Sequence, residues 1–326
     1  MRRSTLFYAV FAVLASGKAW AVNNATLYNA TLPGELSGFS AAVAGPLVDG
    51  LAFAAGSQDF APADAKPTLG FNIGVGAGLS VNNIDKAAAL VHGMDANKGG
   101  NPTVDLSLLT SSVPSSIPVG LGQVNAHLGL PFGFDVGLRY DQLDATLGQN
   151  NVNLKGYTAE IRHDLLTEGL ITPVTLTIGG SYSRLFGTLH LQSSDYTVTG
   201  NYNGSTLSGS SHSTLDAVSD INVYSVEATL SRSLIIVTPY IGVKADTYSG
   251  GTKVTTAQDG NITLTPGGAV NPHIEGSSSQ IAPSSEVRVG AGLKFNLVFV
   301  YLELGGEYGL ISNIGAGHAQ IGAQFR

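Results

Sequence analysis

The chain has 326 residues, a formal net charge of −7 and no cysteine. Without cysteine there are no disulfides, no thiolate catalysis, no zinc–thiolate site and no lipid anchor on an N-terminal cysteine. The acidic balance also lacks the basic stripe that nucleic-acid binding requires. Charged residues make up only 12% of the chain, about half the share of a soluble domain.

The first 21 residues predict a secretory signal peptide. A positive pair, Arg2 and Arg3, precedes an apolar run from Leu6 to Ala15 and a small-x-small cleavage site that ends at Ala21. The run is too short to span a bilayer, and we expect no helix-length apolar segment after it. The alternative is a retained membrane anchor. Cleavage would remove three basic residues and leave a net charge of −10.

Residues 22–66 are interpreted as an N-terminal periplasmic or plug segment that precedes a barrel over residues 67–326. Residues 38–56 are apolar and helix-like, and we expect Gly45-Pro46 to break them. In the strand that follows, Gly70, Gly74, Gly76 and Gly78 would face inward and leave a groove against which a plug at 34–60 could pack. Alternatively, these glycines only permit strong coiling of the sheet.

Apolar and polar residues then alternate with the period of a β-strand in about ten segments. In the first, Ile73 and Val75 alternate with Gly74 and Gly76. Low charge combined with this alternation predicts an all-β, antiparallel, up-and-down transmembrane barrel of about 10 strands, with 12 or 8 as alternatives. A soluble β-sandwich would also alternate. The segments are 69–81, 123–130, 134–141, 157–162, 174–183, 224–231, 241–246, 287–295, 300–308 and 318–325.

The connections between these segments favour the barrel. Short joints are expected at 131–133, 167–173, 235–239 and 296–298, and long polar joints at 83–116, 192–219 and 249–282. If the first strand rises from the periplasm, every short joint lies on the periplasmic side and every long one outside, as in outer-membrane barrels of Gram-negative bacteria. Both termini are then periplasmic. Residues 192–219 could instead extend the strands or add a hairpin.

Outward-facing aromatic residues form two predicted girdles, which favour contact with outer-membrane lipid and lipopolysaccharide. Tyrosines lie near the external strand ends and phenylalanines near the periplasmic ends. The girdle residues are Tyr140, Tyr157, Tyr182, Tyr224 and Tyr308 outside, and Phe134, Phe295 and Phe325 on the periplasmic side.

Three runs resemble signatures of a family of uncharacterised proteobacterial outer-membrane β-barrel proteins: Gly129–Gly137, Gly180–Gly187 and Thr238–Val243. The likeness extends to Ala52-Phe53-Ala54 and covers most of the mature chain. It implies a barrel and brings no established activity or functional residues. The C-terminus resembles the signal read by the barrel-assembly machinery, although Arg326 follows the aromatic residue.

Charged side chains collect on the strand faces that would line the lumen. One interpretation is that they pair and fill a narrow interior, since an unpaired buried charge is costly. Lys294 and Glu303 would face each other across a tight turn. The other interpretation is a charged constriction that selects solutes. The residues are Asp135, Arg139, Asp141, Glu160, Arg162, Glu227, Lys244, Asp246, Arg288, Lys294, Glu303 and Glu307.

We expect neither an enzyme nor a cofactor or metal. His212 and Asp216 share one external loop, flanked by Asp195 and Asp220, without the rigid support that a catalytic base needs. The remaining histidines are scattered and show no metal-ligand spacing; they include His92, His163 and His273.

Two functions remain open. One is a channel or uptake porin for small solutes, and the other is a non-conducting structural barrel that displays long external loops for interaction. The sequence names no solute and leaves the oligomeric state undetermined.

Overall fold

A computed structural model describes residues 32–57, 61–63, 68–83, 116–169, 172–192, 195–202, 205–265, 268–270 and 273–325. Within these residues, ten antiparallel strands close into a barrel, because the first strand pairs with the last as well as with the second. The ten predicted segments correspond to these strands, so the predicted fold is confirmed with ten strands rather than eight or twelve. The predicted signal peptide and its cleavage after Ala21 lie outside the described residues.

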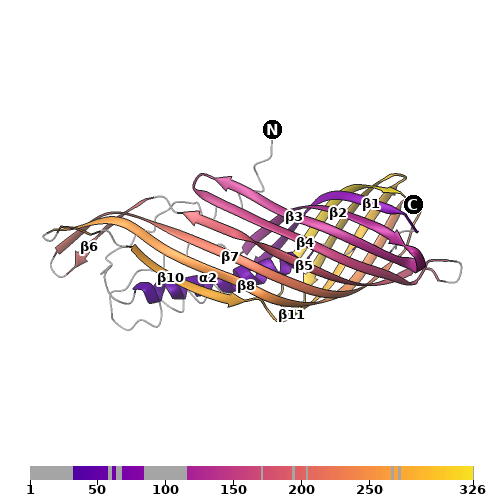
Figure 1. The fold of residues 1–326 in the computed structure, drawn as a ribbon, viewed down its shortest axis with the longest axis horizontal. Coiled ribbons are helices and arrows are strands. Elements are labelled where there is room, and N and C mark those ends of the chain that lie inside the picture. Colours follow the sequence, from indigo (N-terminus) through magenta and orange to yellow (C-terminus); the bar gives the residue numbers. More distant parts are fainter. Residues whose placement is uncertain are drawn as a thin grey trace.

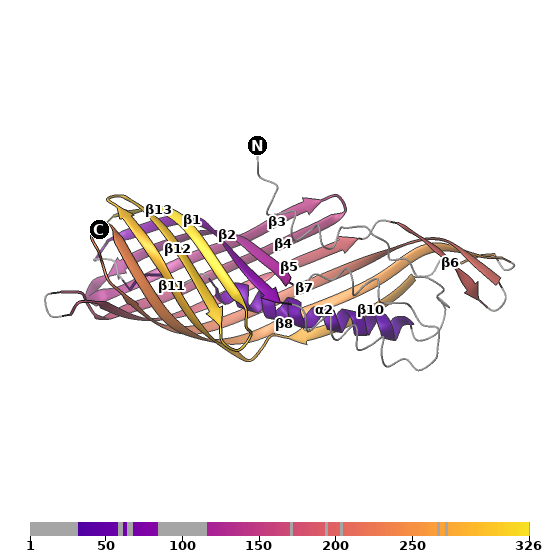
Figure 2. The same cartoon turned by 180° about the vertical axis from the view of Figure 1, so that it is seen from behind.

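Successive barrel strands pair with each other, and shorter upper strands intervene in the chain at two places (Figures 1 and 2). They are β1 (Phe71–Asn83), β2 (Ser116–Leu130), β3 (Phe134–Leu147), β4 (Asn150–Leu166), β5 (Thr175–Gln192), β7 (Ser205–Ser231), β8 (Val237–Thr265), β11 (Ser285–Leu297), β12 (Val300–Gly309) and β13 (Gly315–Phe325). A short 3-10 turn, η1 (Pro131–Gly133), joins β2 to β3. We call the end with the short joints the lower end and the opposite end the upper end.

The wall is inside-out relative to a soluble protein. Ile73 and Val75 on β1 are half exposed on the outer face, whereas Asn72 beside them and Arg162 on β4 are buried inside. Apolar side chains on the outer face are favourable only in an apolar surrounding, and the hydrocarbon region of a lipid bilayer provides one. The alternation of the sequence therefore determines which face of each strand points outward.

The upper end is one-sided, because two strands are much longer than the others. β7 has 27 residues and β8 has 29, whereas a tilted strand crosses a bilayer in about 9–11. Three shorter strands pair with these extensions: β6 (Tyr196–Tyr202), β9 (Gly268–Val270) and β10 (His273–Ile281). The predicted long joints at 192–219 and 249–282 are therefore largely sheet, and of the options for 192–219 the structure has both the extension and the hairpin.

One long helix, α2 (Leu32–Gly56), lies along the extended β7, β8 and β10 and reaches into the barrel (Figures 1 and 2). Two predictions about it are wrong. Pro46 lies within the continuous helix, so Gly45-Pro46 does not break it. We also expected no helix-length apolar segment after the signal peptide, whereas Ser37–Gly56 is long and apolar enough, by length and composition, to cross a membrane. The surrounding apolar wall holds the helix together where Gly-Pro would end it in water.

The interior has two zones. In the lower zone, which we call the lower lumen, inward side chains are polar or charged. Above it, most inward side chains of the wall are aliphatic, with a few threonines and serines among them, and they pack around α2 in a space that we call the upper chamber. Its wall includes Leu121, Leu154, Leu185, Ile221, Val223 and Val254, and α2 contributes Leu47, Val48, Leu51, Ala52 and Ala55.

Candidate functional site

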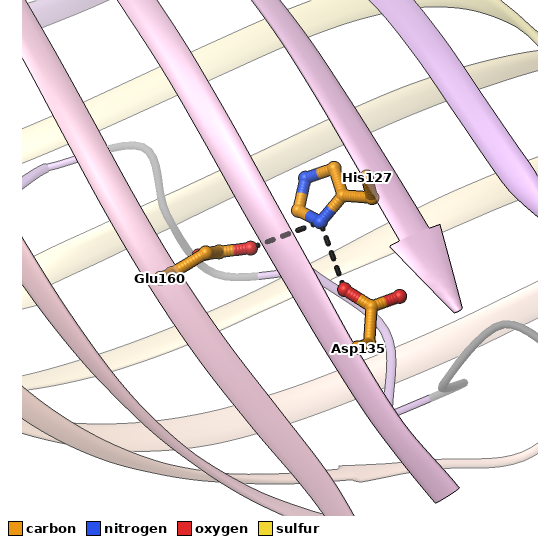
Figure 3. Close-up of side chains that lie close together, drawn as sticks. All are labelled: His127, Asp135 and Glu160. Atoms are coloured by element: carbon orange, nitrogen blue, oxygen red, sulfur yellow. Dashed lines mark hydrogen bonds and ion pairs between the residues drawn. The ribbon is translucent and has the colours of Figure 1, made fainter. Parts of the chain in front are cut away.

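The lower lumen contains three groups of interacting charges, and the first joins β2, β3 and β4. The His127 Nδ1 atom lies 3.1 Å from the Asp135 carboxylate and 3.0 Å from that of Glu160 (Figure 3). Arg162 donates to Asp135 at 3.2 Å and lies 3.6 Å from Glu160. Strand register explains the grouping, because Asp135 is directly opposite Arg162.

The ligand atoms of His127, Asp135 and Glu160 lie within 4.8 Å of one another, which is close enough to hold a metal ion. However, the Arg162 Nη2 atom is 3.3 Å from His127 Nδ1 and already bonds Asp135. A guanidinium therefore occupies the place where a cation would bind. We interpret the group as a paired charge network, since two buried carboxylates need a nearby positive charge.

The second group lies beneath α2. Arg288 is fully buried and lies 2.6 Å from Asp246 and 3.4 Å from Glu307, and it also donates to the Tyr248 hydroxyl at 2.6 Å. Its guanidinium stacks 4.0 Å from the ring of Phe53 in α2.

Lys244 adds a second cation, because its Nζ atom donates to the Gly56 carbonyl at 2.8 Å. Two cations thus meet the C-terminal end of the helix, where the helix dipole favours positive charge.

The third group joins β8, β12 and β13. Glu303 accepts hydrogen bonds from Tyr240 at 3.1 Å and from Gln320 at 2.9 Å, and His318 lies 3.8 Å away. Lys294 is directly opposite Glu303 in the register, as predicted, and its Nζ atom lies 4.4 Å from the ring centre of Tyr301.

All twelve predicted lumen charges lie on inward faces, and most belong to these three groups. Arg139 pairs with Asp141 at 2.9 Å on β3. Glu227 lies on β7, opposite Lys244 in the register. The arrangement favours the interpretation of mutual pairing over an open ring of like charge. Whether the charges also select solutes is a question of function.

Several buried polar atoms of the lower lumen have no protein partner. They include Asn72 Oδ1, Gln123 Oε1, Gln324 Oε1 and the Tyr301 hydroxyl, which lie on β1, β2, β13 and β12. Buried polar groups in proteins are nearly always satisfied, by water where no protein group is available. The β12–β13–β1–β2 side of the lower lumen is therefore suited to hold water.

The upper chamber depends on α2 for its packing. Leu51 on the helix and Ile221 and Val223 on β7 are buried together. Polar contacts also join the helix to the upper wall: the Ser40 hydroxyl lies 2.9 Å from that of Thr256 and donates to the Gly276 carbonyl at 3.2 Å. Below the helix, the Ala63 carbonyl accepts a hydrogen bond from Ser231 at the lower end of β7. The N-terminal chain therefore runs downward through the barrel.

Gly74 and Gly76 on β1 do not form the groove that we expected. A Cβ atom on Gly74 would meet the Tyr301 hydroxyl and Asn125, and one on Gly76 would meet Gln320. Large side chains of neighbouring strands therefore occupy the space above these two glycines, and α2 packs mainly against β7, β8 and β10 instead.

The tyrosine girdle forms a continuous row on β3, β4, β5 and β7. Tyr140 is opposite Tyr157 in the register, and Tyr182 is opposite Tyr224 with ring centres 5.3 Å apart. Tyr308 is exposed on β12. This row marks the height at which the lower lumen gives way to the upper chamber.

The lower aromatic row includes a contact that the sequence did not predict. Phe325 stacks 4.8 Å from Phe71 across the β1–β13 closure and lies 5.8 Å from Phe299. Phe134 stacks on His163 at 4.4 Å, and Phe295 is half-buried near the end of β11.

The upper histidines lie on strands rather than in a flexible loop. His190 pairs with Asp216 at 2.6 Å, His273 with Asp259 at 2.6 Å, and His212 with Asp195 at 3.4 Å.

Asp220 pairs with Arg184 at 2.7 Å, and the Arg184 hydrogen bond lowers the pKa of the Asp220 carboxyl. His92 lies outside the described residues.

Sequence reasoning missed the upper chamber and the polar residues between the charges, such as Tyr248, Tyr301 and Gln320. A signal for the chamber was present. On β7 the apolar positions are even from Tyr224 to Leu230 but odd from Leu215 to Val223, apart from Ser219. This change of phase marks the height at which the wall's apolar face turns inward.

Comparison with family models identifies one match, to a family of unknown function (DUF6588), over residues 1–320. The chain belongs to this family. DUF6588 membership agrees with the predicted resemblance to uncharacterised barrel proteins, while the proteobacterial origin stays a prediction. No curated protein matches the chain.

Among solved structures, this DUF6588 chain is similar to several outer-membrane proteins. The outer membrane protease OmpT from Escherichia coli has a TM-score of 0.37 and 8% identity, with 83% of this chain and 97% of that one covered. The translocator domain of the autotransporter NalP from Neisseria meningitidis has a TM-score of 0.32, 12% identity, and coverage of 91% and 100%.

A third is the toluene transporter TbuX from Ralstonia pickettii, with a TM-score of 0.29, 8% identity, and coverage of 85% and 98%. The three have different activities, and similarity at this level transfers none of them to the DUF6588 chain.

Proposed function

We propose that this protein is an outer-membrane channel for small solutes in which α2 acts as an internal plug. The observation on which the proposal rests is that the wall does not fill the upper chamber by itself. A separate segment, α2, occupies it, and its polar contacts with the barrel include those of Ser40 and Gly56.

The lower lumen supports the proposal. Its unpartnered amide and hydroxyl groups need water, which makes a hydrated path beneath the plug chemically reasonable. Most charges beside that path are paired, but seven of the twelve are carboxylates and five are cations. Small neutral or cationic solutes are therefore favoured over anions as cargo.

The proposal places the barrel in the bacterial outer membrane with its upper end outside, in contact with lipid and lipopolysaccharide. The assembly machinery would recognise the last strand, which ends on the exposed aromatic Phe325. The C-terminus is then periplasmic. The function proposed is transport rather than catalysis.

A non-conducting surface-interaction barrel is the second candidate. The long β7 and β8 with their paired β6 and β10 form a tall external sheet, which is more structure than a simple pore requires. In that case α2 would be a permanent core element of the extension.

Single-channel recording in planar bilayers separates the two. We expect the full chain to be mostly closed and a variant lacking residues 34–60 to conduct steadily. As the matched control, deletion of the β6 segment (Tyr196–Tyr202) removes external sheet and leaves α2 in place, so the current should stay as in the full chain. Heat-modifiable migration on gels verifies that each variant is a folded barrel. Absence of current in both the full chain and the 34–60 deletion would overturn the channel.

A further inference from the structure

Two histidines that are 61 residues apart in the sequence lie in one cross-strand row on the upper sheet. His212 on β7 is directly opposite Asp259 on β8, and Asp259 is directly opposite His273 on β10. Residues directly opposite each other in an antiparallel sheet project from the same face, with Cβ atoms about 4.5–5.5 Å apart. Asp259 therefore lies between the two histidines in the cross-strand row.

These side chains are accessible and already interact. The exposed fractions are 31% for the His212 side chain, 40% for Asp259 and 60% for His273. His273 Nδ1 bonds Asp259 at 2.6 Å, and its Nε2 lies 3.9 Å from Glu275. His212 Nδ1 lies 3.4 Å from Asp195. Two further carboxylates thus flank the row.

We propose that His212, Asp259 and His273 form a binding site for a divalent transition metal ion on the external sheet. Two imidazoles and a carboxylate match the ligand preference of Zn²⁺, Cu²⁺ and Ni²⁺ rather than of Ca²⁺ or Mg²⁺. The flanking imidazoles are long enough to lean over the central carboxylate. Asp195 or Glu275 can complete or orient the ligand set.

Closing the site requires two side-chain movements. His273 and Asp259 must separate from their 2.6 Å hydrogen bond, because two ligand atoms of a tetrahedral zinc ion lie about 3.3 Å apart. The His212 ring must turn from Asp195 towards Asp259, which an exposed side chain does on the nanosecond scale. The backbone needs no change, because the three strands already hold the ligands in register. The site differs in this respect from the group of His127, Asp135 and Glu160, where Arg162 occupies the cation position.

The chain offers a matched control. His190 and Asp216 form a pair of the same type, with the same 2.6 Å separation, on β5 and β7. Their row continues to Asn151 on β4 and Thr255 on β8 and has no second imidazole. This pair therefore tests whether any exposed His–Asp pair suffices.

The test is calorimetric titration of the untagged, metal-stripped full chain in detergent with Zn²⁺ at about pH 8, where imidazoles are neutral ligands. We expect one Zn²⁺ per chain. His212→Ala, His273→Ala and Asp259→Asn should each weaken binding by at least about tenfold, as loss of a supporting group already does at metal sites. His190→Ala should leave the affinity unchanged.

Co²⁺ gives a second readout, since its visible absorption reports nitrogen and oxygen ligands and should be lost in His273→Ala. Heat-modifiable migration verifies that the variants remain folded. Absence of Zn²⁺ binding by the full chain would overturn the site. So would equal weakening by His190→Ala, or a His212→Ala variant with the affinity of the unmodified chain.

Discussion

The wall above the tyrosine row and the wall below it belong to the same strands but have opposite polarity. On β7, Val226 and Tyr224 below and at the row are 64% and 57% exposed on the outer face. Just above it, Val223 and Ile221 are fully buried on the inner face. Lipid stabilises apolar groups outside in the lower part, while α2 supplies an apolar partner inside in the upper part. The local solvent therefore determines which face is apolar.

The largest expected effect is from a charge placed inside the upper chamber. Ile221→Asp leaves an unpaired carboxylate against α2, which should cost about 3–5 kcal/mol of unfolding free energy. Val218→Asp, three residues away on the exposed outer face of the same strand, should change it little. Denaturant titration followed by gel mobility measures both. Equal effects would contradict the inward packing of the chamber.

The next largest effect is expected from a charge placed on the outer face of the wall below the tyrosine row. Val243→Arg on the outer face of β8, below the row, should cost about 2–4 kcal/mol, because arginine is unfavourable in the middle of a bilayer. Thr255→Arg on the outer face of the same strand above the row should be tolerated. Reversible unfolding in lipid vesicles gives both values. A tolerated Val243→Arg would show that this part of the wall does not face lipid.

The smallest effect concerns two Arg–Asp pairs of similar geometry. Arg184 and Asp220 are exposed above the row, whereas Arg288 and Asp246 are fully buried below it. Arg184→Gln should not measurably change the unfolding midpoint at neutral pH, because water screens the pair. Arg288→Gln removes the guanidinium that lies against the buried carboxylates of Asp246 and Glu307 and should destabilise the barrel more than Arg184→Gln does.

The pH dependence follows from the Asp220 carboxyl, whose pKa Arg184 lowers. Any stabilisation by this pair is present above the ordinary pKa of aspartate and is lost as the pH falls through the lowered value. The difference in unfolding midpoint between the unmodified chain and Arg184→Gln should therefore stay small at neutral pH and vanish once the pH falls below the lowered pKa. A large difference at neutral pH would mean that the pair is less exposed than the structure shows.

The sequence predicted the barrel because period-two alternation is a local property. The pattern within each segment shows which of its side chains face lipid and which face the lumen. It also predicted the inward position of charges such as Arg288 and Glu303. The length of β7 and β8 was underestimated, because Ser, Thr and Gly in their upper parts are typical of loops, and only pairing with each other makes them sheet.

The sequence did not predict which side chains on different strands contact each other. The contact of Lys244 with Gly56 and the row of His212, Asp259 and His273 depend on which distant segments lie side by side. Alternation determines the face of the sheet on which a side chain lies, but not which residue of the adjacent strand lies opposite it. The helix was recognised as apolar, yet Gly45-Pro46 indicated a break, because intrinsic propensity takes no account of the enclosing wall.

The most direct test of the plug uses the absence of cysteine. The Ser40 and Thr256 hydroxyls are 2.9 Å apart, so the double variant Ser40→Cys/Thr256→Cys should form a disulfide that fixes α2 to β8. In planar bilayers we expect the oxidised protein to remain closed and a reductant to restore the openings of the unmodified chain. Currents that are the same before and after reduction of a verified disulfide would contradict a gating role for α2.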